Sequence, residues 1–471
     1  MDIRQAKEEL RRAFLSYTER GEDGALAIAP IHQRPLLLMG PPGVGKSAVL
    51  MQLAQELNTN LVAYTMTHHT RQSALGLPLI REKQFGGRTC SATEYTMSEI
   101  LATVYERMEK SGIETGILFL DEINCVSETL MPAILQLLQS KRFGTHALPE
   151  GWMIAAAGNP PKYNESARLF DTVTMDRVRL LSITESFPVW RSYALSRGVH
   201  PAVLSYLELN PEHFYCIEPR AHGRCFVTAR GWEELSQTLF SYERLGFPLD
   251  PALFGEYLQH DEISASFAAY FQLFSALQKS VDIPAIFSGQ SGDAAPALRA
   301  MRFDARLAAI EFLLHALSRE LTQYRKVSAF SESLSSFCAA LSGVNAPVRT
   351  ARENLARRES ALQIRKDCGA ISGAEEAAER QFAKRVHALL DHEDELTLLL
   401  QEEARCRQAR LSAQEALAGK LENAMQFVFS TFGAGQELLV FLTQLENLPD
   451  CKRFLQRSAR YQALLSRVLP A

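Results

Sequence analysis

The residues best suited to chemistry form a glycine-rich run near the start of the chain. The run Gly40-Pro41-Pro42-Gly43-Val44-Gly45-Lys46-Ser47 fits the pattern GxxxxGKS, between an apolar stretch at 36–39 and a helical stretch at about 46–57. Glycines let backbone N–H groups wrap phosphate oxygens, and the N-terminus of the following helix attracts the same negative charge. Lys46 is expected to reach the β- and γ-phosphates, and the Ser47 hydroxyl is expected to ligate Mg²⁺.

Two acids follow a second apolar run. Asp121 and Glu122 come directly after residues 116–120, which are predicted to form a buried strand. Ligands of open α/β sheets bind at the carboxyl ends of the strands. We expect Asp121 to hold Mg²⁺ and Glu122 to polarise the water that attacks the γ-phosphate. Paired acids after a strand also begin many helices, but the preceding phosphate loop favours the catalytic interpretation.

A third strand is predicted to end in an amide. Asn159 follows the apolar run 153–157, where its side chain could orient the attacking water or contact the γ-phosphate. An asparagine before proline is otherwise an ordinary turn residue. Its order in the chain, after the loop and the acidic strand, favours the site.

Arginines complete the candidate site. Arg177 follows Asn159 and is expected to reach the nucleotide of a neighbouring subunit, where a guanidinium stabilises charge on the transferred phosphoryl group. Arg168 and Arg179 are alternative candidates for that role, and a surface ion pair with Asp171 or Asp176 is the plainer explanation of Arg177. Arg230 opens a later predicted helix and could contact phosphate from there.

Apolar periodicity gives the expected architecture. Short apolar strands alternate with helices over the first 180 residues, which indicates an α/β fold with a parallel sheet flanked by helices. We predict a nucleotide-binding core at 1–185, an all-α lid at 186–279, a linker at 280–297 and a C-terminal helical region at 298–471 that could be a coiled-coil hairpin. The linker is inferred from its Gly, Ser and Pro content.

Composition excludes several protein classes. The 471 residues carry 50 Lys and Arg against 54 Asp and Glu, so the net charge of −4 makes nucleic acid an unlikely partner. No run is apolar and long enough to span a bilayer, and we expect a cytoplasmic protein. The eight cysteines form no CxxC pair, so neither a zinc site nor a disulfide framework is expected.

The ordered motifs resemble the AAA+ ATPases, specifically the MoxR-like, dynein-related branch with a helix-2 insert. The resemblance covers about residues 20–275. It implies that 40–47 is Walker A, that Asp121 and Glu122 are Walker B, that Asn159 is sensor 1, and that Arg177 is the arginine finger. Arg230 would be sensor 2, although Ala229 stands where relatives usually have proline. Residues 70–78 resemble the insert segment, and residues 142–146 resemble the pre-sensor-1 hairpin.

The resemblance also implies a function and partners. It predicts an ATP- and Mg²⁺-dependent ring, expected to be a hexamer, which remodels or matures a partner that carries a von Willebrand factor A domain. A nucleic-acid-acting or restriction-type NTPase and a nucleotide-gated scaffold remain the alternatives. The predicted catalytic residues are Glu122, Asn159 and Arg177, the predicted metal ligands are Ser47 and Asp121, and the predicted nucleotide-binding residues are Gly40, Pro41, Pro42, Gly43, Val44, Gly45, Lys46, Ser47, Ala48, Asp121 and Arg230.

Overall fold

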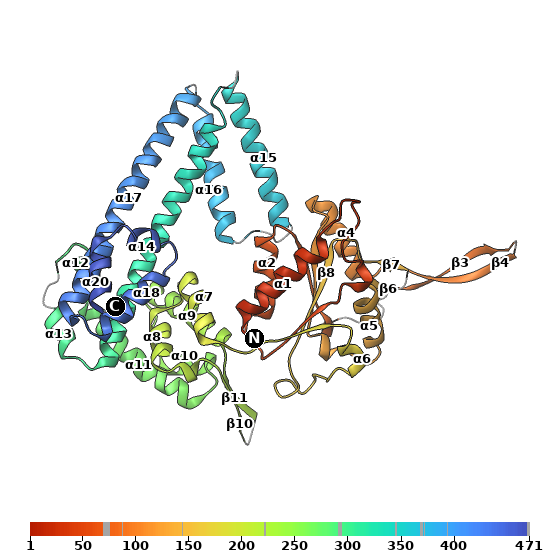
Figure 1. The fold of residues 1–471 in the computed structure, drawn as a ribbon, viewed down its shortest axis with the longest axis horizontal. Helices are drawn as coiled ribbons and strands as arrows, with labels where there is room; N and C mark the ends of the chain where they lie inside the picture. Colours follow the sequence, from red (N-terminus) through yellow and green to blue (C-terminus); the bar gives the residue numbers. More distant parts are fainter. Residues whose placement is uncertain are drawn as a thin grey trace. The chain divides into compact units, whose positions relative to one another are not determined.

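The computed structural model consists of two compact units. It describes residues 1–68, 76–86, 88–143, 145–220, 223–290, 294–343, 346–367, 371, 373–392 and 394–468. The first unit comprises residues 1–186 with 355–383, and the second comprises 187–354 with 384–471. Figure 1 shows their helices and strands. No helix among the described residues is both long and apolar enough to cross a membrane.

A five-stranded parallel sheet forms the centre of the first unit. Its order is β2-β5-β8-β1-β9, and its strands are β1 (Leu36–Met39), β2 (Asn60–Thr65), β5 (Gly116–Asp121), β8 (Trp152–Gly158) and β9 (Arg179–Ser182). The strand before the phosphate loop, β1, lies between β8 and β9. The acidic strand β5 lies between β2 and β8. The loops that carry the predicted site residues therefore leave neighbouring strands at one edge of the sheet.

Helices cover both faces of this sheet. The main helices of the first unit are α1 (Ile3–Thr18), α2 (Lys46–Glu56), α4 (Glu99–Ser111) and α5 (Met131–Ser140), followed by the short α6 (Thr172–Met175). Alternate residues of β1 point to opposite faces. Leu36 and Leu38 pack in one apolar cluster with residues of α1 and α2, whereas Leu37 packs with residues of α4 and α5 in another. The predicted α/β fold, a parallel sheet flanked by helices, is confirmed.

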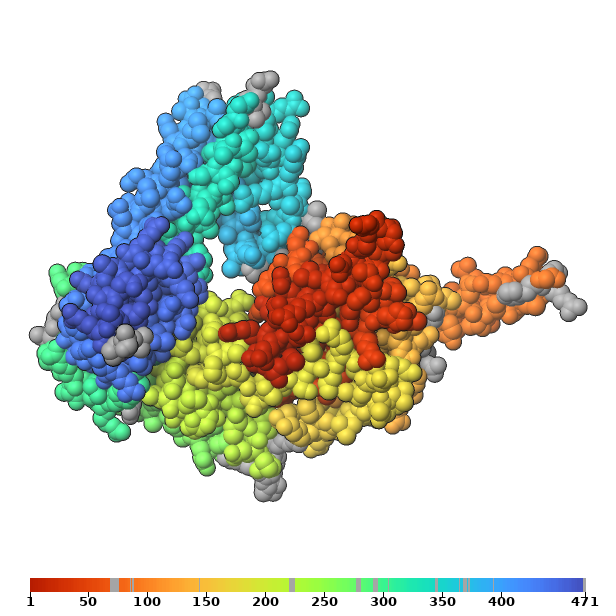
Figure 2. Space-filling view, viewed as in Figure 1, coloured from red at the N-terminus to blue at the C-terminus, as the bar shows by residue number. Residues whose placement is uncertain are grey.

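Two antiparallel hairpins branch from the first unit. The long one pairs β3 (Pro78–Phe85) with β4 (Arg88–Tyr95), and most of its described side chains are exposed (Figure 2). The short one pairs β6 (Arg142–Phe143) with β7 (His146–Ala147), where a pre-sensor-1 hairpin was expected. Residues 70–75 of the expected insert segment lie outside the described residues.

The second unit begins with helices and one hairpin. In chain order these are α7 (Phe187–Arg197), α8 (Pro201–Leu209), β10 (Cys216–Arg220), β11 (Gly223–Val227), α9 (Ala229–Leu245), α10 (Pro251–Tyr257) and α11 (Asp261–Ser280). It continues with α12 (Ile283–Phe287), α13 (Ala294–Ala300), α14 (Phe303–Ala339), α17 (Glu395–Phe432), α18 (Gln436–Asn447), α19 (Lys452–Leu455) and α20 (Ala459–Val468). Between α14 and α17, α15 (Pro347–Asp367) and α16 (Gly373–Leu390) each contribute residues to both units.

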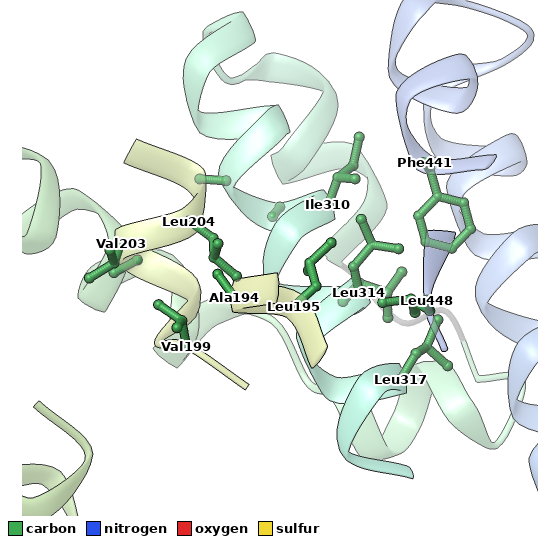
Figure 3. Close-up of a cluster of buried hydrophobic side chains, with 14 of the residues drawn as sticks. Ala194, Leu195, Val199, Val203, Leu204, Ile310, Leu314, Leu317, Phe441 and Leu448 are labelled. Atoms are coloured by element: carbon green, nitrogen blue, oxygen red, sulfur yellow. The ribbon is translucent and has the colours of Figure 1, made fainter. Parts of the chain in front are cut away.

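One hydrophobic core runs through the second unit. Figure 3 shows Leu195 of α7, Leu204 of α8, Leu314 of α14 and Phe441 of α18 in the same buried cluster. The long helices α14 and α17 pack against each other in opposite directions, because Glu320 pairs with Lys420 and Glu332 pairs with Arg410. The expected lid and the expected C-terminal region therefore share a core.

The segment 280–297 differs from the expected linker. It contains α12, whose N-cap Asp282 accepts a hydrogen bond from the N–H of Ala285, and the first half of α13. Both helices pack against α17. Ile286 is only 2% exposed and belongs to the core of the second unit. Pro284 lies in the first turn of α12, and Gly289 lies in the turn that follows this helix, so the segment is part of a folded unit rather than a spacer between domains.

Candidate nucleotide site

The phosphate loop has the backbone that its glycines allow. Gly43 and Gly45 have φ values of 75° and 91°, in the left-handed region that favours glycine. The helix α2 begins immediately afterwards at Lys46. Gly40 meets a different constraint, because a Cβ at this position would lie 2.7 Å from the carbonyl oxygen of Ile183. The loop therefore needs glycine twice for its turn and once for its packing against the end of β9.

Lys46 holds its ammonium group inside the loop. Its side chain is buried, with 8% of its surface exposed. The Nζ atom donates to the carbonyl oxygens of Gly40 and Pro41, at 2.9 and 2.8 Å, and to Oδ1 of Asn159 at 2.8 Å. The predicted loop lysine and the predicted sensor asparagine are thus in direct contact. The ammonium group of Lys46 and the amide group of Asn159 can both contact a γ-phosphate bound at this point.

Ser47 and Asp121 also meet, although 74 residues separate them in the chain. The Ser47 hydroxyl donates to Oδ2 of Asp121 at 2.8 Å. The other oxygen of Asp121 accepts the backbone N–H of Glu122 at 2.9 Å, which fixes the carboxylate at the end of β5. A hydroxyl and a carboxylate side by side supply hard oxygen donors, which are the ligands that Mg²⁺ prefers. The residues present fit that ion.

Glu122 stands in an unusual backbone conformation. Its φ of 54° places it in the left-handed region, which residues other than glycine rarely adopt and which costs them about 1–2 kcal/mol. The turn directs its carboxylate towards β2, where Oε2 accepts a hydrogen bond from Oγ1 of Thr67 at 2.9 Å. Thr67 was not predicted from the sequence. Its one signal is its position just after β2, the strand that pairs with β5 so that Thr65 lies opposite Asp121.

A second asparagine supports the end of β8. Nδ2 of Asn124 donates to the carbonyl oxygen of Asn159 at 2.8 Å, and the Asn124 carbonyl accepts the N–H of Arg168 at 2.9 Å. Its side chain lies so close to Gly158 that a Cβ there would be 2.5 Å from Asn124 Oδ1. Asn124 therefore holds the turn that presents Asn159. It was also absent from the predicted site, because nothing in its local sequence distinguishes it.

The three candidate arginines of the first unit have different surroundings. Arg168 pairs with Glu128 at 2.6 Å, and Arg179 pairs with Glu9 at 3.2 Å. Arg177 is exposed just after α6, where its guanidinium contacts neutral groups: the carbonyl of Val173 at 3.4 Å and the side-chain amide of Gln139. Of the two acids expected as surface partners of Arg177, Asp176 pairs instead with Arg34, at 3.9 Å. Hydrogen bonds from Thr174, and to a smaller extent the charge of Arg177, lower the pKa of the other, Asp171.

Arg230 lies in the first turn of α9, in the second unit, and its side chain is exposed. The helix starts at Ala229 without the proline that relatives usually have there. The Thr228 side chain accepts the N–H of Gly231 at 3.3 Å and caps the first turn. A threonine N-cap satisfies one of the free N–H groups of a helix start. Ala229 is therefore compatible with a well-formed start of this helix.

One family model matches the part of the chain that carries this geometry. Residues 35–174 match the family model described as an AAA domain of the dynein-related subfamily. Two solved structures of RuvB mutants from Thermotoga maritima align with 42% of this chain, each at 14% identity and a TM-score of 0.26. The aligned part spans about half of those RuvB chains, 51% and 50%. No curated protein matches the chain.

The matched range 35–174 begins just before β1 and includes the phosphate loop, the acidic end of β5 and Asn159. An AAA domain is an ATP-hydrolysing domain that uses Mg²⁺. Residues 35–174 of this chain are therefore an AAA domain of the dynein-related subfamily, which is an ATPase domain.

Proposed function

We propose that this protein is a MoxR-like AAA+ ATPase of the cytoplasm, which assembles into a ring and uses ATP hydrolysis to remodel or mature a partner protein. The observation that most directly supports this proposal is the cluster at the carboxyl edge of the sheet, where Lys46 contacts Asn159 and Ser47 contacts Asp121. Glu122 stands beside them, held by Thr67. This set combines phosphate binding, metal binding and a base for water in one place.

The chain's own residues divide the chemistry among them. The backbone of 40–47 and the Lys46 ammonium would bind the triphosphate, with Ser47 and Asp121 holding Mg²⁺. When bound, Mg²⁺ neutralises charge on the phosphate oxygens. Glu122 would take a proton from the attacking water while Asn159 orients that water or contacts the γ-phosphate. Positioning and charge stabilisation, rather than covalent chemistry, supply most of the rate in phosphoryl transfer.

Ring formation is proposed from Arg177. A guanidinium supplied to the transferred phosphoryl group must be exposed, and Arg177 is exposed, hydrogen-bonds to neutral groups and lies near the carboxylate of Asp171. Arg168 and Arg179 are engaged by carboxylates of their own unit. We therefore assign the trans role to Arg177, which makes a subunit interface, with a hexamer as the proposed ring, part of each active site.

A protein client fits the surface charge better than nucleic acid does. On the β3–β4 hairpin, Arg81 and Lys83 both pair with Glu94. Hydrogen bonding to Lys83 lowers the pKa of the Glu94 carboxyl, so Glu94 stays charged at physiological pH and offsets one of these two positive charges. Phosphate contacts by free Lys and Arg dominate nucleic-acid affinity. A von Willebrand factor A domain protein is proposed as the client on the resemblance to MoxR-like ATPases.

Mixing two inactive variants tests the shared site. Arg177→Ala and Glu122→Gln subunits should each hydrolyse ATP slowly, because one lacks the trans guanidinium and the other lacks the base. Trans arginines are worth about 10³–10⁵-fold in rate in well-studied cases. In a mixture, some interfaces pair an intact Glu122 with an intact Arg177, so activity should partly recover. Arg34→Ala, which removes another exposed arginine of the same unit, serves as a control and should keep the parent rate.

The outcomes are distinct. Recovery in the mixture, together with an ATP-dependent increase in mass by light scattering, supports a ring with Arg177 in trans. A mixture that stays inactive while labelled subunits exchange contradicts it. Stimulation of turnover by duplex DNA, but not by a von Willebrand factor A domain protein, would contradict the proposed protein client.

A further inference from the structure

Potential metal ligands converge in the second unit, away from the phosphate loop in sequence. Cys216 and Glu218 lie on β10, and His260 lies between α10 and α11. One ligand atom from each of these three side chains lies within 4.8 Å of the others. His260 is buried at 5% exposure, Cys216 is partly buried and Glu218 is exposed. Within the described part of the chain, this cluster combines a thiol, an imidazole and a carboxylate.

Strand register explains why these residues meet. Cys216 and Glu218 are two residues apart on β10, so their side chains share one face of the β10–β11 hairpin. Glu218 lies opposite Cys225 of β11, and this places Cys225 on the same face. An antiparallel bridge pairs Phe226 with Gln259, and the Phe226 N–H donates to the Gln259 carbonyl at 2.9 Å. Cys225 precedes Phe226 in β11, and His260 follows Gln259, so these two residues adjoin the same bridge.

Cys225 thus adjoins the three clustered residues. Its side chain is buried at 4% exposure, and its Sγ lies 3.7 Å from the carbonyl oxygen of Glu218. Two thiols, one imidazole and one carboxylate therefore occupy one face, contributed by both strands of the hairpin and by the start of α11. Backbone pairing holds the hairpin and the start of α11 together, so only the Cys225 sulfur has to move to join the three clustered ligand atoms at one ion.

One distance in the cluster matches the spacing of two ligands around a bound zinc ion. Zn²⁺ takes Cys sulfur at about 2.3 Å and His nitrogen at about 2.0–2.1 Å, so tetrahedral ligand atoms stand about 3.3–3.8 Å apart. The Nε2 of His260 lies 3.7 Å from Oε2 of Glu218, within that range. A distance of 3.7 Å is too long for a good hydrogen bond. These two groups face each other at the separation that two ligands of one ion would have.

Metal binding has one local cost, at the other nitrogen of His260. Nδ1 accepts a long contact of 3.4 Å from the N–H of Ile263 at the start of α11. Coordination through Nε2 would place the imidazole proton on Nδ1, so that contact would be lost. The lost bond is a weak one, because its length exceeds the usual 2.7–3.2 Å.

We propose that Cys216, Glu218, Cys225 and His260 form a structural Zn²⁺ site. A closed four-ligand site of this kind stabilises the fold and leaves no position open for substrate. It would tie the β10–β11 hairpin to the turn between α10 and α11. The hairpin comes immediately before Thr228 and the helix α9, which carries Arg230. The expectation that scattered cysteines exclude zinc rested on spacing within the chain, whereas this site is assembled across strands.

Zinc content of the purified full-length protein tests the site. The protein is expressed with zinc in the medium, dialysed against buffer with excess Mg²⁺ and no ATP, and analysed by inductively coupled plasma mass spectrometry. We expect about one zinc ion per chain. Cys216→Ser and His260→Ala should each lower zinc affinity by at least about 100-fold, since losing even a supporting residue costs 10–100-fold. Cys90→Ser, at an exposed cysteine of the β3–β4 hairpin, is the matched control and should retain zinc.

Cobalt substitution tests the site in the parent protein, so this measurement does not depend on how well a variant folds. The parent protein, stripped with a chelator and loaded with Co²⁺, should show the absorption of thiolate-to-metal charge transfer and tetrahedral coordination. The band should persist in Cys90→Ser and fall in Cys216→Ser and in Cys225→Ser. A parent protein that binds neither zinc nor cobalt, or unchanged zinc in Cys216→Ser, overturns the site. A Cys216–Cys225 disulfide in the protein purified under reducing conditions also overturns it.

Discussion

Replacing Thr67 by valine tests whether Glu122 depends on the hydrogen bond that holds it. The Thr67 hydroxyl donates to Oε2 of Glu122 at 2.9 Å, and both groups are accessible at the carboxyl edge of the sheet. Hydrogen bonds to charged groups contribute about 1.5–3 kcal/mol, and solvent access puts this one at about 1–2 kcal/mol. That energy corresponds to a factor of about 5–30.

We therefore expect Thr67→Val to lower kcat by about 5–30-fold. The KM for ATP should stay nearly unchanged, because the contacts of Lys46 and Ser47 are untouched. Thr67→Ser keeps the hydroxyl and is the matched control, which should remain within about twofold of the parent. Steady-state ATPase assays measure both constants, and circular dichroism checks that the variants fold.

A double-mutant cycle decides whether Thr67 acts through Glu122. Glu122→Gln alone should lower kcat by about 10²–10⁴-fold, because the carboxylate base is lost. If Thr67 only positions that base, adding Thr67→Val to Glu122→Gln should cost much less than it costs in the parent. An equal loss in both backgrounds, or a loss with Thr67→Ser as large as with valine, would refute the reasoning.

Further predictions concern binding, pH and packing. Lys46→Ala should abolish binding of a fluorescent ATP analogue, because the ammonium that we propose to contact the phosphates is removed; binding at the parent affinity would contradict the proposed site. Burial lowers the pKa of Lys141 to about 8, below its value of 10.5 in the unfolded chain. Between these values the unfolded chain binds the extra proton, so the free energy of unfolding should rise by up to about 3 kcal/mol from about pH 8 to pH 10.5, relative to Lys141→Met in urea titrations; equal pH slopes would contradict this. Gly40→Ala should lower the Tm, because its Cβ would lie 2.7 Å from the Ile183 carbonyl, whereas Gly419→Ala, in open space on α17, should not; equal Tm values would contradict the clash.

Local sequence determined the elements of the site that depend on a few adjacent residues. The loop 40–47 carries its own conformation, because Gly43 and Gly45 permit positive φ values and Lys46 begins a helix. The apolar runs before Asp121 and Asn159 form buried strands of one parallel sheet, as their patterns predicted. Periodicity and glycine placement are encoded within a few residues, so they can be read without the fold.

The prediction of a linker at 280–297 was wrong, because composition reports turns but not burial. Glycine, serine and proline at 280–297 indicated a break in regular structure, and the chain does turn there. Composition could not show that Ile286 is buried in the core with α17, since burial depends on what lies opposite in space. Turn residues report the local backbone, and domain boundaries are set by packing.

Only the tertiary structure decided which residues meet across the sheet and the hairpin. Thr67 reaches Glu122 because β2 pairs with β5, and Asn124 supports Asn159 because β5 pairs with β8. The position of helix α1 distinguishes Arg179 from Arg177, because Glu9 of this helix pairs with Arg179. Cys216 and His260 likewise meet through strand register, across 44 residues of chain (216 to 260). A residue's own neighbours in sequence fix its backbone, whereas its partners in space depend on the order and register of strands, which no local pattern specifies.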